Sequence, residues 1–503
     1  MTMDAHNGTT KGETVRDLHF ENRMAKQRER LQTSPEELGV RVDNSPYGPE
    51  SKRILHQMVD RESTGQVGFS LFDCPPVIVR GENATVYDAD GKSYIDMLAG
   101  FSVSNVGQAN PDVGAAIANQ AQDLIHYFDL PNEPRERLAG RLSQLVPGDD
   151  RRVAFGVTGA ESIDLAIKLA RWYTGAPQIL SAYGGYHGTT QGTMATTTKG
   201  GMWSYFYPVG PHETGHAKIP FSYPYRCPVG ASPENCAEAC LEFVRRMFRG
   251  KETPFGDGRG ISNVAAILLE PMQASAGYVI PGDGYLSGIR ELCDEFGMLL
   301  ILDEIQAGLG RTGRWWASEH DGVVADIMTV SKGLASGIPI SAVVANGELL
   351  TSWGPGAHVG TFAATPLACA AAHATLDIYE RDGLVERADS VGRYFRERLD
   401  ELAAKHPIIG WIDAKGLFVG IELVNDRETK EPAVEGTQRV LEHCVSAGLL
   451  FERGGYYYNR LQLIPPLTIE YAQIDEAISI LDDAFASAER ELGIERPTQV
   501  AGA

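Results

Sequence analysis

The chain has 503 residues, 43% of them hydrophobic, which is enough for a large core and for more than one domain. Its 45 Lys and Arg against 66 Asp and Glu give a formal charge of −21, which disfavours nucleic acid and anionic membranes as partners. No apolar run reaches transmembrane length and the N-terminus shows no apolar signal region, so we expect a soluble, cytoplasmic enzyme. Attraction of a cationic substrate by the acidic surface stays open.

The first 66 residues look like an extension. Residues 20–32 predict a charged helix, and residues 33–39 predict a cap followed by a short turn. Short alternating strands follow in residues 75–100, where Asp90-Gly91 is typical of a hairpin turn between two of them.

From about residue 120 to 345 the pattern changes to continuous apolar runs with helical patterns between several of them. The runs are residues 153–158, 178–183, 265–271, 299–304, 327–331 and 341–346. Residues 160–174 and 284–297 predict helices, the second closed by Gly297. Buried strands that alternate with helices predict a mostly parallel sheet, whose ligands sit at the carboxyl ends of its strands.

The C-terminal part predicts a smaller α+β domain. It contains a long helix at 388–406, strands at 417–424 and 460–467, and a closing helix at 473–493. We therefore expect an α/β protein divided into four segments. These are the extension 1–66, a first part of the small domain 67–118, a large cofactor-binding domain 119–377, and the rest of the small domain 378–503.

Three of the predicted strand ends carry residues suited to one chemistry. Thr158, Gly159 and Ala160 are small residues at a helix start, where backbone N–H groups can bind a phosphate. Asp303 and Lys332 end two further strands. Each feature alone has an ordinary explanation: a tight turn, a helix cap, a solvated lysine. Together they suit pyridoxal phosphate, which needs a Schiff-base lysine, a phosphate site and an acid for its ring nitrogen.

The stretch "LLILDEIQAGLGRTGRWWASEHDGVVADIMTVSKGLASGIPISAVV" resembles the signature of class III pyridoxal-phosphate aminotransferases, of the fold type I superfamily. The resemblance extends from about residue 75 to 490 and includes "GGYHG", "LLEPMQASAGYVIP" and "GTFAATPLACAAA". It implies a large domain with a mostly parallel sheet, a smaller α+β domain and a pyridoxal 5'-phosphate cofactor.

The resemblance also implies roles for single residues. Lys332 would form the Schiff base and then move the substrate proton, Asp303 would pair with the ring nitrogen, and Gln306 would bond the ring hydroxyl. Thr158, Gly159 and Ala160 would hold the phosphate.

Further roles concern the ring faces and the neighbouring subunit. Tyr186 would stack on the ring with His187 beside it. Glu270 would lie by the ring and orient Asp303 or Gln306. Thr361 would reach the phosphate of the neighbouring subunit, which implies a homodimer with a shared active site.

The chain departs from the family at the site that usually binds a substrate carboxylate. Many members have Arg where Gln462 stands, and an acidic residue where Ser275 stands. Gln lacks the bidentate charged fork that Arg offers a carboxylate. Either the main substrate has no such carboxylate, or Arg460 or Arg453 binds it. Tyr457 is a candidate for an aromatic wall of the pocket.

Three functions stay open. The first is an aminotransferase acting on an amine without a tightly held carboxylate, such as an amino sugar or another natural-product intermediate of antibiotic biosynthesis. The second is an epimerase, racemase or dehydratase on the same scaffold, and Pro224 to Gly230 ("PYRCPVG") resembles a segment of the racemase-like branch. The third is a scaffold protein without cofactor, which intact Lys332, Asp303 and Gln306 disfavour.

Seven cysteines in a chain of this length argue against a disulfide framework. Cys227, Cys236 and Cys240 cluster, but no fourth ligand or matching CxxC pair accompanies them, so the sequence predicts no metal site.

Overall fold

A seven-stranded sheet forms the centre of the structure, a computed structural model that describes residues 33–63, 68–70, 72–198, 215–250, 253, 255 and 263–494. The expected helix at 20–32 lies outside these residues. The strands are β4 (Arg151–Gly156), β5 (Gln178–Ala182), β6 (His216–Ile219), β7 (Val264–Leu269), β8 (Leu299–Asp303), β9 (Ile327–Val330) and β10 (Ser341–Asn346). Six of these seven correspond to the predicted apolar runs, and β7 is buried along its whole length, as expected of a strand covered on both faces.

The order of the strands is β4-β10-β9-β8-β7-β5-β6, and β10 alone runs against its neighbours. The prediction of a mostly parallel sheet is confirmed. Because the remaining strands share one direction, the ends of β4, β5, β7, β8 and β9 meet at the same edge of the sheet. This edge carries the residues discussed below.

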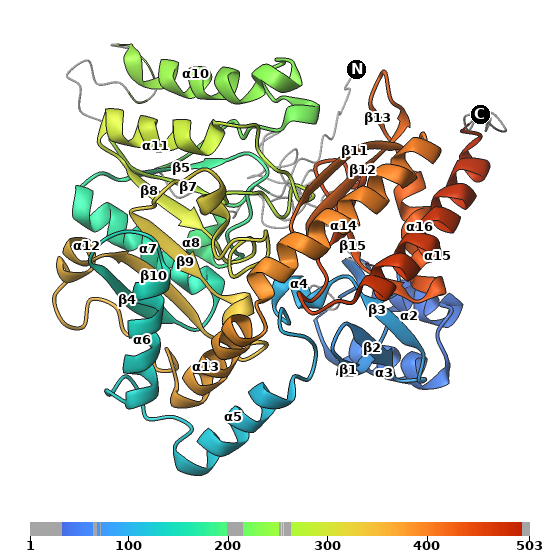
Figure 1. Ribbon diagram of the computed structural model, residues 1–503, viewed down its shortest axis with the longest axis horizontal. Helices are drawn as coiled ribbons and strands as arrows, with labels where there is room; N and C mark the ends of the chain where they lie inside the picture. The colour runs from blue at the N-terminus through green and yellow to red at the C-terminus, as the bar shows by residue number, and fades with distance from the viewer. Residues whose placement is uncertain are drawn as a thin grey trace, which may run out of the picture. The chain divides into compact units, whose positions relative to one another are not determined.

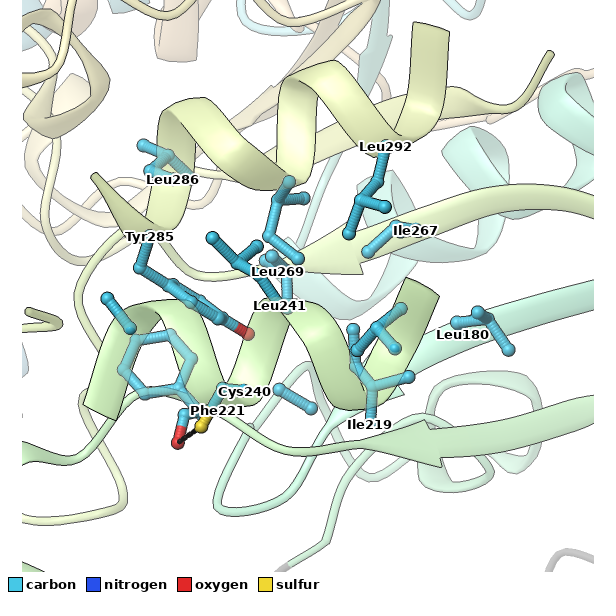
Figure 2. Packing of buried hydrophobic residues seen from close by; sticks show 14 of the residues in the cluster. Leu180, Ile219, Phe221, Cys240, Leu241, Ile267, Leu269, Tyr285, Leu286 and Leu292 are labelled. Atoms are coloured by element: carbon cyan, nitrogen blue, oxygen red, sulfur yellow. Dashed lines mark hydrogen bonds between the residues drawn. The ribbon is translucent and has the colours of Figure 1, made fainter. Parts of the chain in front are cut away.

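Helices cover both faces of the sheet (Figure 1). On one face, α7 (Gly159–Thr174) buries the predicted stripe that includes Ile163, Ala166 and Ile167. On the other face lie α10 (Cys236–Arg249) and α11 (Tyr285–Phe296). Figure 2 shows Leu241 of α10 and Leu286 of α11 pointing toward the same apolar core as Ile267 and Leu269 of β7.

Further helices complete this part of the chain. They are α4 (Ala99–Ser102), α5 (Pro111–Asp123), α6 (Glu133–Leu145), α8 (Gln191–Met194), η2 (Pro224–Arg226), η3 (Pro233–Asn235), η4 (Ala317–His320), η5 (Lys332–Leu334), α12 (Gly347–Thr351) and α13 (Pro366–Arg381).

The C-terminal part is the expected α+β layer. Its sheet has the order β11-β12-β16-β15, with β13 paired to β12, and Figure 1 shows helices gathered around it. The elements are α14 (Leu384–Lys405), β11 (Ile409–Lys415), β12 (Phe418–Asp426), β13 (Glu431–Pro432), α15 (Val434–Ala447), β14 (Leu449–Leu450), β15 (Glu452–Gly454), β16 (Arg460–Leu463) and α16 (Tyr471–Leu492).

A third sheet joins distant parts of the chain. Its strands β1 (Ile78–Glu82), β2 (Thr85–Asp88) and β3 (Ser93–Asp96) are followed in the sheet by β14, which pairs in parallel with β3. The expected hairpin between β2 and β3 is confirmed, with Gly91 at a φ of 89° in its turn.

The described residues up to Val77 form a compact unit separate from those that follow. It contains α2 (Pro35–Asn44), α3 (Pro49–Arg61) and η1 (Gly68–Ser70). The predicted cap is present, because Ser34 and Glu37 form a capping box. The short turn expected after it is a helix of 10 residues. The four-segment domain division stays a prediction.

Within the described part of the chain, each helix is too short or too polar to span a lipid bilayer.

Candidate active site

Lys332 lies directly after β9 and contacts Gln306, which follows β8. The Lys332 ammonium donates to Gln306 Oε1 at 2.6 Å. Gln306 Nε2 in turn donates to the hydroxyl of Tyr278 at 3.0 Å. Lys332 has a φ of 42°, a conformation that is uncommon outside glycine, and the turn η5 holds it there. The two predicted residues are therefore brought together.

The environment of Lys332 destabilises its ammonium form. Burial lowers the pKa of Lys332 to about 8 because it penalises the ammonium form. Three carboxylates act in the opposite direction, those of Asp303, Glu270 and Glu452. A lysine that is partly neutral near physiological pH is a competent nucleophile for a carbonyl group.

Asp303, the last residue of β8, contacts His187 in the loop after β5. Its Oδ2 lies 2.7 Å from His187 Nδ1, and only 4% of Asp303 and 3% of His187 are exposed. The other oxygen accepts from the backbone N–H of Ile305 at 3.1 Å and from the Thr329 hydroxyl at 3.4 Å. With Nδ1 donating to Asp303, the other ring nitrogen of His187 is buried and has no hydrogen-bond partner.

Glu270 follows β7 at the same edge of the sheet. Its two oxygens accept from the backbone N–H groups of Tyr186 at 2.9 Å and Ala274 at 2.8 Å. Burial, reinforced by the charge of Asp303, raises the pKa of Glu270 to about 7. We expected Glu270 to orient Asp303 or Gln306. Its hydrogen bonds instead fix the backbone of the Tyr186 loop, because both oxygens face that loop and the turn after β7.

The expected phosphate cradle is the start of α7, where Thr158 is the N-cap. The Thr158 hydroxyl accepts from the backbone N–H of Glu161 at 3.2 Å. A side chain at Gly159 would lie 3.0 Å from Ile305. Gly188 has a φ of 129°, and a Cβ there would lie 2.7 Å from the side chain of Ala160. Because these segments approach each other closely without side chains between them, backbone N–H groups remain at this helix start. Such groups can bind an anion.

Tyr186 and Thr361 lie in different surroundings. Tyr186 is partly buried, and burial followed by the charges of Glu270 and Asp303 raises its pKa. Thr361 is exposed on the surface of the chain, where its carbonyl accepts from His126 Nε2 at 2.6 Å.

Gln462 on β16 reaches the segment that contains Ser275. Its Nε2 donates to the backbone carbonyl of Ala274 at 2.8 Å. Only 4% of Gln462 is exposed, and Ser275 is partly buried. The two positions where the family often has Arg and an acid are thus adjacent here, and a neutral hydrogen bond joins their segments.

Arg460 is occupied by a buried polar network. Its guanidinium lies 2.7 Å from Asp413 and 3.1 Å from Glu422, and it also donates to the Tyr223 hydroxyl at 2.8 Å. Only 1% of Arg460 is exposed. The expectation that Arg460 could bind a substrate carboxylate is therefore corrected, because two protein carboxylates already neutralise it.

The other substrate-site candidates are more exposed. Arg453 is partly buried, with its guanidinium 5.8 Å from the ring centre of Tyr458. Tyr457 is 51% exposed, and the guanidinium of Arg226 lies 5.2 Å from its ring centre. Tyr457 therefore lies at the surface of the chain rather than in an enclosed wall.

Sequence reasoning missed Tyr278 and Glu452. Tyr278 is fully buried with a φ of 59° and accepts the Gln306 hydrogen bond. Glu452 is 5% exposed, and its charge acts on Lys332 from β15. Glu452 lies directly opposite Gln462 on the neighbouring strand. The sequence could not reveal this position because it does not give the register of β15 against β16.

Comparisons with known proteins agree with this geometry. The family model "Aminotransferase class-III" matches residues 72–485. A leucine/methionine racemase of Thermococcus litoralis is 39% identical over 82% of this chain and 91% of its own length. A 5-aminovalerate aminotransferase of Pseudomonas aeruginosa is 35% identical over 82% of this chain and 93% of its own.

A solved structure provides a similar comparison. It is the taurine:2-oxoglutarate aminotransferase of Bifidobacterium kashiwanohense in complex with pyridoxal phosphate and glutamate. Its TM-score is 0.79 at 26% identity, covering 89% of this chain and 100% of that one.

The residues present fit pyridoxal phosphate. The partnerless ring nitrogen of His187, the tight glycine contacts at the start of α7 and the partly neutral Lys332 all follow strands that end at the same edge of the sheet. This donor set combines a nucleophilic amine, a buried carboxylate and an anion site, which are the groups that this cofactor requires.

Proposed function

Because the chain belongs to the class-III aminotransferase family, we propose that it moves an amino group between an amine and an aldehyde or ketone whose carboxylate, if any, is not tightly held. Its cofactor is pyridoxal 5'-phosphate. An amino sugar or another natural-product intermediate, as found in antibiotic biosynthesis, is a substrate of this kind.

One observation carries the substrate class. Gln462 stands where many family members have an arginine, and its amide is already bonded to the backbone of Ala274. Arg460, the nearest guanidinium in sequence, is neutralised by Asp413 and Glu422. A substrate carboxylate would therefore meet neutral groups at Gln462 and Ser275, which give weaker binding than a bidentate Arg.

The proposed chemistry assigns each residue a task. When bound, pyridoxal phosphate supplies an electron sink and carries the amino group. Lys332 would hold the cofactor covalently and would move the proton at the substrate carbon. Asp303 would face the ring nitrogen, with His187 holding Asp303 in place. The start of α7 would bind the phosphate, and Gln306 would bind the ring hydroxyl.

A panel of donors tests this function. Primary amines, amino sugars, ω-amino acids and α-amino acids are each mixed with the purified enzyme, without an acceptor. Conversion of the cofactor to its amine form and the keto product are measured. We expect the fastest conversion with a donor that lacks a carboxylate. Faster conversion by α-amino or ω-amino acids across the panel would contradict the proposed substrate class.

A second candidate is racemisation or epimerisation. It is favoured by the similarity to the leucine/methionine racemase. A racemase also needs no second, carboxylate-bearing substrate, so it would not require an Arg at position 462. In deuterium oxide, a racemase exchanges the hydrogen at the amine carbon without net loss of amine. Stoichiometric keto product without such exchange favours the aminotransferase.

We also propose a cytoplasmic homodimer with a shared site. Apolar side chains are exposed at two segments that hydrogen-bond through His126 and Thr361. Tyr127 is 63% and Phe362 is 62% exposed, and Ile125, Phe128, Leu130 and Val359 are also exposed. Apolar patches of this kind mark protein contacts.

The proposed cytoplasmic location is supported by the cysteines. All seven are free, which suits a reducing compartment.

A further inference from the structure

Three cysteine thiols meet at the start of α10, away from the residues assigned above. Cys227 directly follows η2, Cys236 is the first residue of α10, and Cys240 lies one helical turn later on the same face. The three sulfur atoms all lie within 4.8 Å of one another.

The cluster is enclosed on one side and accessible on the other. Cys236 and Cys240 are 0% exposed, and they belong to the apolar core between α10, α11 and the sheet. In Figure 2 the sulfur of Cys240 is directed toward the backbone carbonyl of Phe221, 3.9 Å away. Cys227 is partly exposed, so it provides a path from solvent to the buried pair.

Local groups support ionised sulfur at this place. The hydroxyl of Ser222 interacts with Cys236. The backbone N–H groups of Val229 and Ala231 interact with Cys227.

The turn after Cys227 is tight. Its carbonyl accepts from the backbone N–H of Gly230 at 3.1 Å, with Gly230 at a φ of 77°. This turn brings the amides that follow Cys227 back toward its sulfur, an arrangement that stabilises a thiolate.

We propose that Cys227, Cys236 and Cys240 bind one thiophilic divalent cation of the zinc class. Zn–S bonds of about 2.3 Å place tetrahedral sulfurs about 3.8 Å apart, so the thiols need to close by about 1 Å at most. The fourth position is left for water or a small ligand, as in zinc sites with three protein ligands. The absence of a fourth cysteine at this cluster among the described residues therefore does not exclude the site.

The bound cation would hold the segment that precedes Cys227. Tyr223 and Arg226 of this segment both contact the buried carboxylate of Glu422, and Tyr223 also contacts Arg460. Cation binding thus links α10 to the network beneath the small-domain sheet. We expect it to stabilise the fold without entering the transamination chemistry.

The test uses the full chain, kept reduced, stripped of metal by a chelator and then dialysed against Zn²⁺. Metal content is measured by mass spectrometry. We expect one equivalent in the wild type and its loss in Cys227→Ser, Cys236→Ala and Cys240→Ala. Cys74→Ser and Cys444→Ala are the matched controls, a partly exposed and a buried cysteine outside the cluster, and both should retain the metal. Co²⁺ in place of Zn²⁺ should show sulfur-to-metal charge-transfer absorption.

A second measurement covers variants that fail to fold. In the wild type, Zn²⁺ should protect Cys227 from alkylation at least tenfold, while the alkylation of Cys74 is unchanged. Zinc content no higher in the wild type than in the folded variants, or equal alkylation of Cys227 with and without Zn²⁺, would overturn the proposal. A disulfide between two of the three cysteines in protein purified without reductant, together with no zinc uptake after reduction, would also overturn it.

Discussion

His187 donates from Nδ1 to the carboxylate of Asp303 across 2.7 Å, with both side chains almost completely buried. The two residues are 116 positions apart in sequence and come from the ends of β5 and β8. A buried carboxylate needs hydrogen-bond partners. The contact with His187 occupies Oδ2 of Asp303 and so fixes the orientation of the carboxylate. The proposed pairing of Asp303 with a cofactor ring depends on that orientation.

Replacement of His187 tests this dependence. His187→Ala removes the donor and should lower kcat by about 10- to 100-fold, as loss of an orienting partner does in comparable sites. His187→Asn keeps a donor near Nδ1 and should recover most of the rate. The absorbance of the bound cofactor against pH is the second readout, since it reports the ring nitrogen. Equal rates and equal spectra for the two variants would show that His187 only fills space.

The lowered pKa of Lys332 predicts how cofactor capture depends on pH. Only the neutral amine attacks an aldehyde, so the rate should rise with pH and level off above about 8. An unperturbed lysine would go on rising to about 10.4. The measurement is stopped-flow binding of pyridoxal phosphate to cofactor-free protein. Lys332→Ala is the control and should show no covalent phase, while a midpoint above about 10 would contradict the burial argument.

Gln462→Arg should restore affinity for carboxylates. The new guanidinium would lie in the strand position opposite Glu452 and near Ser275. We expect kcat/KM for a dicarboxylate oxo acid to rise about tenfold, or about 1.4 kcal/mol, in Gln462→Arg. Steady-state kinetics with oxo acids and with carboxylate-free aldehydes provide the comparison. A parallel change for both substrate classes would mean that Gln462 does not set carboxylate preference.

Arg460 should contribute to stability rather than to substrate binding. Arg460→Met leaves Asp413 buried without its counter-charge and leaves Glu422 with Arg226 alone, which should lower the free energy of unfolding by about 3–5 kcal/mol. Arg453→Met, which removes one contact with Tyr458, should cost about 1 kcal/mol or less. Urea unfolding of both variants gives these values. A stable Arg460→Met protein with a raised KM would instead show that Arg460 binds the substrate.

Phe362 should be part of the subunit contact. Phe362→Asp places a charge on the exposed apolar surface next to Thr361 and should dissociate the proposed dimer, with loss of activity. Light scattering measures the mass in solution. Val434→Asp, at a position 44% exposed on α15, is the control and should leave the mass unchanged. A Phe362→Asp protein with full activity as a monomer would exclude a shared site.

Most of the central sheet could be predicted from the sequence, because long buried runs such as residues 299–303 leave few alternatives. Strand β6 at His216–Ile219 was missed, since it has a short edge pattern with a lysine and a histidine. The role of Arg460 could not be predicted either. It lies on the same strand face as Gln462, but its direct cross-strand neighbour is Glu422, and sequence alone does not give that register.

The candidate site could likewise be predicted only in part. The spacing of the motifs predicted that Lys332, Asp303 and Gln306 lie at one edge of the sheet, because parallel strands end together. The hydrogen bonds of Glu270 to backbone N–H groups, and the approach of Glu452 to Lys332, depend on loop geometry and strand register that no local pattern carries.

The most direct test of the account is to locate the covalent attachment of the cofactor. The enzyme is loaded with pyridoxal phosphate, reduced with borohydride and digested, and the labelled peptide is sequenced by mass spectrometry. The account predicts one label per chain, on Lys332, and none in Lys332→Ala. A label on another lysine, or a protein that takes up no label, would contradict it.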